Sequence, residues 1–111
     1  MTRMDRLKAL LDFLDEDPND SFTRFALARE YQKRGAFEEA RAYFEGLVER
    51  DPEYVGTYYH LGKLLETSGR REAAISTYKA GIEIARRQRD SHVLAELQSA
   101  LTQAEGIGFE D

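Results

Sequence analysis

The side chains best suited to catalysis or metal binding in this sequence are two histidines, His60 and His92, and a large set of carboxylates. A metal site needs several nitrogen, oxygen or sulfur ligands that converge on one point. The two histidines are 32 residues apart, and neither has a ligand-spaced histidine or acidic partner on its own helical face. We therefore interpret both as groove or surface residues. The chain has no cysteine, which excludes a disulfide framework, a thiolate metal site and a cysteine nucleophile.

The carboxylates themselves do not form a recognisable acid/base pair. The stretches FLDEDPND and AFEEARAYFE are typical of helix ends and solvated helix faces, and no glycine-rich phosphate loop follows a predicted strand. From the sequence we predict a protein that is not an enzyme and that uses no cofactor and no metal.

The sequence argues against two further classes of partner, nucleic acids and membranes. With 21 acidic and 16 basic residues, the net charge is −5, whereas a general nucleic-acid binder needs a surplus of cations. The basic cluster Arg86, Arg87 and Arg89 stands at a predicted helix C-terminus, where cations interact favourably with the helix dipole. No apolar run reaches the length of a membrane span or of a secretion signal. We expect a cytoplasmic protein that binds neither nucleic acid nor membranes.

The chain is an offset copy of itself. Its two prolines, Pro18 and Pro52, each follow an aspartate and are 34 residues apart. The same shift of 34 pairs Thr23 with Thr57, Leu27 with Leu61, Gly35 with Gly69, Ala40 with Ala74 and Phe44 with Tyr78. A register held over a whole period indicates a true internal repeat.

Within each period the apolar spacing is that of two helices. A first stripe ends at Gly35 or Gly69, where we expect the left-handed conformation that glycine adopts readily. A second stripe ends before the next Asp-Pro, because proline removes a backbone donor and keeps the residue before it out of helical space. Small residues, Ala28 or Gly62 on the first helix and Ala40 or Ala74 on the second, predict a close helix crossing that bulk would wedge open.

These positions resemble the tetratricopeptide repeat (TPR) family. Its pattern of aromatic-x-x-Leu-Gly-x-x-Tyr, then Ala, Phe and Pro, is matched in the first unit by Leu27, Ala28, Tyr31, Ala40, Phe44 and Pro52, and in the second by Tyr58, Leu61, Gly62, Leu65, Ala74 and Tyr78. Arg24 stands where the first aromatic residue belongs, which suggests a more exposed edge. Arg86 replaces the second closing proline, which suggests that the last hairpin helix runs on through IARRQR.

The resemblance implies an all-α fold, a short right-handed solenoid of antiparallel helical hairpins with about six helices. We expect a single domain over residues 1–111. Its parts are an N-terminal half-repeat helix at 3–16, repeats at 17–50 and 51–88, a C-terminal capping helix at 90–104 that begins at Asp90 or Ser91, and a tail at 105–111. The half-repeats at both ends would cover apolar flanks that a single hairpin cannot bury.

The resemblance also implies a concave groove that holds a peptide segment of a protein partner, so that the chain acts as an adaptor or scaffold. Carried over position by position, the groove residues are Phe22, Phe25, Arg29, Gln32, Lys33, Tyr59, His60, Lys63 and Glu66. This mixture of basic and aromatic groups suits an acidic or C-terminal carboxylate peptide with an apolar anchor. Phe25 and Tyr59 could instead pack against the preceding helix, and Arg29 and Lys63 could be ordinary solvated residues.

An alternative function follows from the ends of the chain. The apolar faces of Met4 to Leu14 and of Val93 to Ala104 each have one flank that no predicted helix covers. Such faces could stack between chains and give a self-associating structural module, so we expect a monomer or a weak homodimer.

Overall fold

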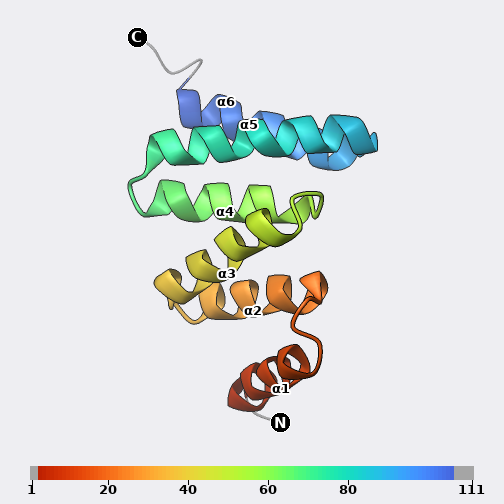
Figure 1. Cartoon of the computed structure of the whole chain (residues 1–111). Coiled ribbons are helices and arrows are strands. Elements are labelled where there is room, and N and C mark those ends of the chain that lie inside the picture. The colour runs from red at the N-terminus through yellow and green to blue at the C-terminus, as the bar shows by residue number, and fades with distance from the viewer. Residues whose placement is uncertain (1–2, 107–111) are drawn as a thin grey trace. The chain divides into compact units, whose positions relative to one another are not determined.

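The computed structural model describes residues 3–106, with side chains from residue 6 onward. Over this range the chain forms six α-helices packed as antiparallel hairpins, which confirms the predicted all-α, TPR-like fold (Figure 1). The chain divides into two compact units, residues 1–51 and 52–111, and each is described by itself below.

The first unit consists of α1 (Arg3–Glu16), α2 (Ser21–Lys33) and α3 (Phe37–Arg50). Helices α2 and α3 pack as a hairpin around a core of fully buried side chains from Leu27, Ala28, Ala40, Phe44 and Leu47. Two aromatic pairs reinforce that contact: Phe25 meets Phe44 edge to face at 6.1 Å between ring centroids, and Tyr31 stacks on Tyr43 at 5.7 Å. Helix α1 packs on α2, but none of its described side chains is fully buried.

The second unit consists of α4 (Gly56–Thr67), α5 (Arg71–Gln88) and α6 (Ser91–Glu105). In Figure 1, α4 and α5 run side by side, and α6 packs against both. Helix α5 continues through Arg86 and Arg87 to Gln88, as predicted from the missing proline. Its extra turn is tied back to the start of the unit, because Arg87 Nη1 lies 3.1 Å from Glu53 Oε2 and Gln88 Nε2 donates to the Glu53 carbonyl at 2.7 Å.

Glycines make the turns and the close approaches. Gly35 and Gly69 have φ of +78° and +79°, which confirms the predicted left-handed stops. A Cβ on Gly62 would come within 2.1 Å of the Tyr78 ring, so the predicted close crossing of α4 and α5 depends on the missing side chain. The long α5 ends differently, at Arg89 with φ of +58°, and Asp90 then caps α6 by accepting the Val93 N–H at 3.1 Å.

Each repeat has an equivalent hydrogen bond from its first helix to the proline turn, but the donor side chain differs between the two repeats. Arg24 Nε donates to the Pro18 carbonyl at 2.8 Å, and the Tyr58 hydroxyl donates to the Pro52 carbonyl at 2.6 Å. Arg24 and Tyr58 are 34 residues apart, so each ties the first helix of its hairpin to the proline turn before it. Arg24 departs from the aromatic pattern of the repeat, but it makes the same hydrogen bond to the turn that Tyr58 makes in the second repeat.

Candidate functional site

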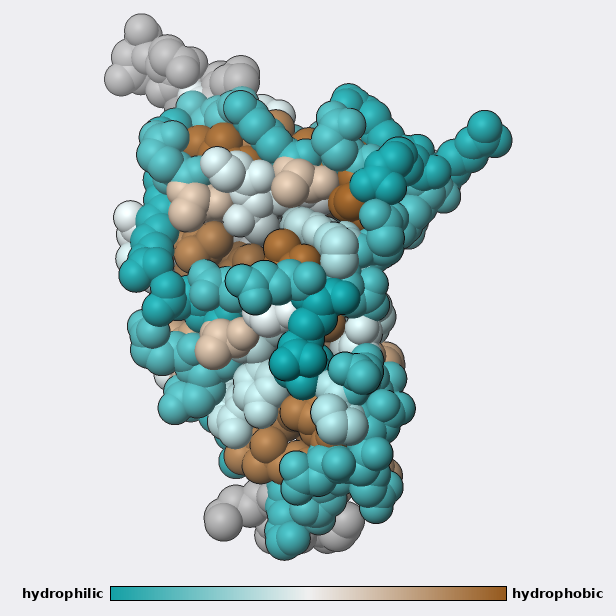
Figure 2. All heavy atoms as spheres, viewed as in Figure 1, coloured by the Kyte–Doolittle hydropathy of each residue, from teal (hydrophilic) through white to brown (hydrophobic). Residues whose placement is uncertain are grey.

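The first unit contains a hollow between α1 and α2. It has a volume of about 240 Å³ and is lined by Arg6, Phe22, Phe25, Ala26, Arg29, Glu30 and Lys33. A neighbouring hollow of about 420 Å³ is lined by Arg6, Glu30, Lys33 and Arg34. Figure 2 shows apolar side chains bordered by polar ones on the surface formed by these two helices. We call the two hollows together the α1–α2 hollow.

A buried carboxylate organises the wall of the α1–α2 hollow. The Glu30 side chain is only 5% exposed and lies between two arginines, with Arg6 Nε 3.1 Å from Oε1 and Arg34 Nε 3.0 Å from Oε2. Burial alone would raise the pKa of Glu30, but the hydrogen bonds and charges of Arg34 and Arg6 outweigh that effect and lower it below its usual value. Glu30 is therefore ionised at neutral pH and holds one arginine from each helix.

The α1–α2 hollow has a cationic and an apolar end. Of its described lining residues, four are cations and one is an anion, in a chain whose net charge is −5. Phe22 contributes an aromatic ring whose residue is 67% exposed, which is unusual for a side chain of this size. The arrangement can bind an anionic group and an adjacent apolar group at the same time.

The second unit presents a different set of side chains on α4. Lys63 Nζ lies 5.9 Å from the centroid of the Tyr59 ring and 3.7 Å from Glu66 Oε1, and the Tyr59 and His60 rings meet edge to face at 5.4 Å. The charges of Lys63 and Glu66 offset each other, so this face of α4 is aromatic and close to neutral.

Behind this face lies Tyr78, whose side chain is fully buried. Burial raises the pKa of its hydroxyl, and the nearby Glu66 carboxylate raises it further. Tyr78 is thus a neutral core residue that packs against α4, and it is unsuited to act as an acid or a base near neutral pH.

The nine predicted groove residues fall into two sets. Phe22, Phe25, Arg29 and Lys33 together line the α1–α2 hollow. Gln32 is half-buried, and its Oε1 atom is buried with no hydrogen-bond partner among the described residues. The remaining four lie along α4 in the second unit, so a continuous groove that uses both sets stays a prediction.

Sequence reasoning missed Arg6 and Glu30. The i,i+4 spacing of Glu30 and Arg34 within one helix was a usable signal for that half of the cluster. The contact of Glu30 with Arg6 joins residues 24 apart that are not related by the repeat, and no local pattern indicates it.

Residues 3–106 contain no helix that is long and apolar enough to cross a membrane. Among the same residues, no group of three or more histidine or acidic side chains is placed to hold a metal ion.

Comparison with known proteins gives a consistent result. The sequence pattern of the tetratricopeptide repeat family matches residues 31–101. This chain is similar to the tetratricopeptide repeat domain protein of Salinibacter ruber, with 55% identity, coverage of 79% of this chain and 98% of that one, and a TM-score of 0.77. It is also 35% identical over 103 residues to the cellulose synthase operon protein C of Pseudomonas fluorescens. That match covers 87% of this chain but spans only 7% of the length of the Pseudomonas protein.

Two more distant structures share the fold alone. The TPR2B domain of yeast Sti1, solved as a pHsp70 complex, has 20% identity, a TM-score of 0.83 and coverage of 89% of this chain and 79% of that one. PcrH, solved with the chaperone binding region of PopD, has 17% identity, a TM-score of 0.86 and coverage of 94% and 79%.

Proposed function

Because the chain belongs to the tetratricopeptide repeat family, we propose that it is a non-catalytic adaptor that binds a peptide segment of a protein partner in the cytoplasm. The binding residues in this proposal are those predicted on α2 in the first unit and those predicted on α4 in the second. The observation that carries this proposal is the α1–α2 hollow, which gathers four of those residues, two of them aromatic and two basic, around one space.

Two structures of similar fold support the choice of ligand. Sti1 was solved in complex with pHsp70, and PcrH with a region of PopD. A fold of this kind can therefore hold a segment of another protein, and this chain offers both charge and apolar surface for such a segment.

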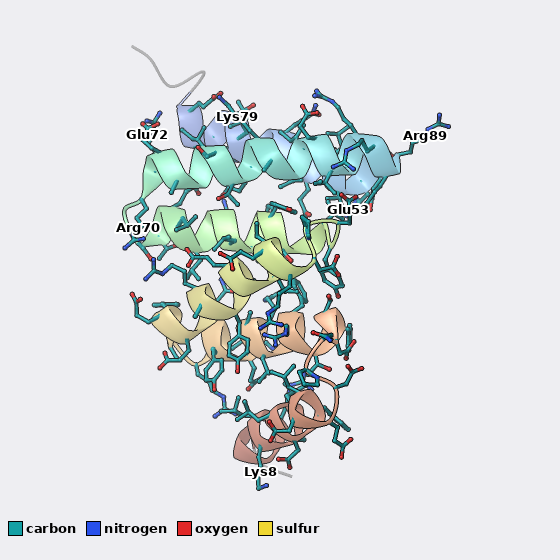
Figure 3. The ribbon with its side chains drawn as sticks, viewed as in Figure 1. Lys8, Glu53, Arg70, Glu72, Lys79 and Arg89 are labelled. Carbon is teal, nitrogen blue, oxygen red and sulfur yellow. The ribbon has the colours of Figure 1, made fainter. Side chains whose placement is uncertain are left out.

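The test is affinity capture from a native cell extract, with partners identified by mass spectrometry. Arg29→Glu and Lys63→Glu, one on each of the two helices, should each lose the partner that the wild-type chain retains, since each reverses a predicted contact charge. Lys79→Glu reverses a charge on α5 whose side chain is 61% exposed, and this variant should retain the partner (Figure 3). Helicity measured by circular dichroism must be equal in all four proteins. If both groove variants keep the partner, the groove is not the binding surface.

Self-association is the second candidate function, and one observation favours it. Phe13 on α1 is 59% exposed, and the described apolar side chains of this helix are at most half-buried. A second copy could cover this face. Light scattering over a range of concentrations should then show a mass that rises above that of one chain, and Phe13→Asp should abolish the rise. A constant monomer mass would exclude this function.

A further inference from the structure

We propose that the α1–α2 hollow is the anion-binding subsite of this protein, and that it takes a carboxylate of a short acidic peptide segment with an apolar side chain next to it. This inference rests on the proposed function and adds to it a place, a partner chemistry and a ligand-binding residue on α1, Arg6. From the sequence, that helix is predicted as a half-repeat, and it is assigned no groove residue.

Charge complementarity selects an anionic occupant. Among the described residues, the α1–α2 hollow is lined by four cations, Arg6, Arg29, Lys33 and Arg34, and by one carboxylate, Glu30. Glu30 is already engaged by two of these cations, so the wall keeps an excess of positive charge. The chain as a whole carries −5, so a long polyanion such as a nucleic acid would be repelled beyond the hollow. A short segment with one or two carboxylates matches the small size of the cationic surface.

Within residues 6–106, the bonding of Arg6 through Nε leaves its terminal nitrogens for a ligand. Arg6 bonds Glu30 through Nε, and its side chain is 59% exposed. A guanidinium held in this way is fixed in orientation while its outer edge faces solvent, and that edge matches a carboxylate with two parallel hydrogen bonds. Glu30 is thus a positioning residue, which holds Arg6 without contacting the ligand itself.

The apolar end of the α1–α2 hollow sets the second requirement. Phe22, Phe25 and Ala26 line the same hollow as Arg6, Arg29 and Lys33. A carboxylate bound at the cationic end therefore brings the neighbouring side chain of the peptide against aromatic surface, where an apolar residue is favoured. The segment we expect is an acidic group adjacent to a leucine or an aromatic residue, either inside a chain or at a free C-terminus.

The binding test uses the full chain and fluorescein-labelled hexapeptides, with fluorescence anisotropy as the readout. One peptide ends in Asn-Leu-Phe with a free carboxylate, one in Asp-Leu-Phe amide, and the neutral control in Asn-Leu-Phe amide. We expect at least one of the two acidic peptides to bind about tenfold more tightly than the neutral one, and to weaken as salt is added. The tighter of the two identifies the source of the carboxylate. Equal binding of all three peptides, or binding of none, would overturn the proposal.

Variants locate the subsite. Lys33→Glu and Arg6→Gln should each weaken the acidic peptide by about tenfold and leave the neutral one unchanged. Lys8→Glu is the matched control, because Lys8 lies on α1 two residues after Arg6, is 76% exposed, and points away from α2 (Figure 3). It should change the affinity by no more than about twofold. If Lys8→Glu lost as much affinity for the acidic peptide, the loss would come from the overall charge of the protein and not from this subsite, and the proposal would fail.

The partner found by affinity capture separates failure of this inference from failure of the proposed function. If Lys63→Glu loses the partner while Lys33→Glu and Arg6→Gln keep it, the protein is an adaptor but the α1–α2 hollow is not its anion subsite. If all three variants keep the partner and the acidic peptides do not bind, neither proposal survives.

Discussion

Replacement of Gly81 by alanine should destabilise the protein, although the same change usually stabilises a helix. Gly81 lies inside α5, and a Cβ there would come within 2.5 Å of Tyr58 Cβ, 2.9 Å of Tyr58 Cγ and 3.0 Å of Leu97 Cδ1. The Tyr58 Cβ is attached to the α4 backbone and cannot rotate away. Tyr58 is 3% exposed and Leu97 is fully buried, so neither has free space to move into.

The magnitude follows from two opposing terms. Alanine in place of glycine in a helix interior gains about 1 kcal/mol. Carbon atoms pack at about 3.5–4.0 Å, so α4 and α5 would have to separate by about 1 Å at this point. Overpacking of a closed core costs about 1–3 kcal/mol, and the upper end applies because the obstacle is fixed to a backbone. We expect a net loss of about 2 kcal/mol, or a fall in Tm on the order of 10 °C.

Urea unfolding followed by circular dichroism measures this loss, and Gly46→Ala is the matched control. Gly46 also lies inside a second hairpin helix, α3, but a Cβ there would meet nothing within 4 Å. Gly46→Ala should therefore raise the free energy of unfolding by about 1 kcal/mol. If Gly81→Ala is as stable as Gly46→Ala, the close approach of α4 and α5 at Gly81 does not exist and the argument fails.

Three further predictions concern turns and charge. Arg89→Gly should raise the free energy of unfolding by about 0.5–1 kcal/mol, because glycine relieves the strain of the left-handed backbone at residue 89 by more than the lost interaction of the arginine with the helix dipole. A lower urea midpoint would contradict this prediction. Gly35→Ala, at a φ of +78°, should lower the free energy of unfolding by about 1 kcal/mol in the same titration, and an unchanged value would count against the left-handed turn. Glu30→Gln should cost about 1.5 kcal/mol at pH 7, since hydrogen bonds to charged Arg6 and Arg34 are weakened. Because the folded pKa of Glu30 lies below 4.5, its stabilising contribution is present above pH 4.5 and is lost as the pH falls through the folded pKa, so the two proteins should converge in acid. A difference that does not depend on pH would rule out the ionised carboxylate as its cause.

Much of the fold could be predicted because its signals are local. The left-handed stops at Gly35 and Gly69 follow from the backbone freedom of glycine, and the run of α5 to Gln88 follows from the missing proline. The helical stripes and the period of 34 residues led to antiparallel hairpins, and the structure confirms them.

The candidate site was less accessible to such reasoning. The predicted groove residues were carried over by position in the repeat, so they are confined to α2 and α4. Arg6 is on the N-terminal half-repeat helix, to which this scheme assigns no groove residue, and its ion pair with Glu30 crosses between helices. Nothing in the spacing of two charges 24 residues apart shows that they meet.

The sequence by itself determined the repeat, the helices and the turns, because these depend on backbone preferences and on apolar spacing along one segment. Only the tertiary structure decided what differs between the two copies. Position 47 holds a fully buried leucine, while the equivalent position 81 requires glycine because Tyr58 and Leu97 close the space around it. In the same way, Arg24 and Tyr58 are unlike side chains that make equivalent hydrogen bonds, each to the carbonyl of the proline in its own turn. Packing brings together atoms from distant positions, and equal places in a repeat can therefore have unequal neighbours.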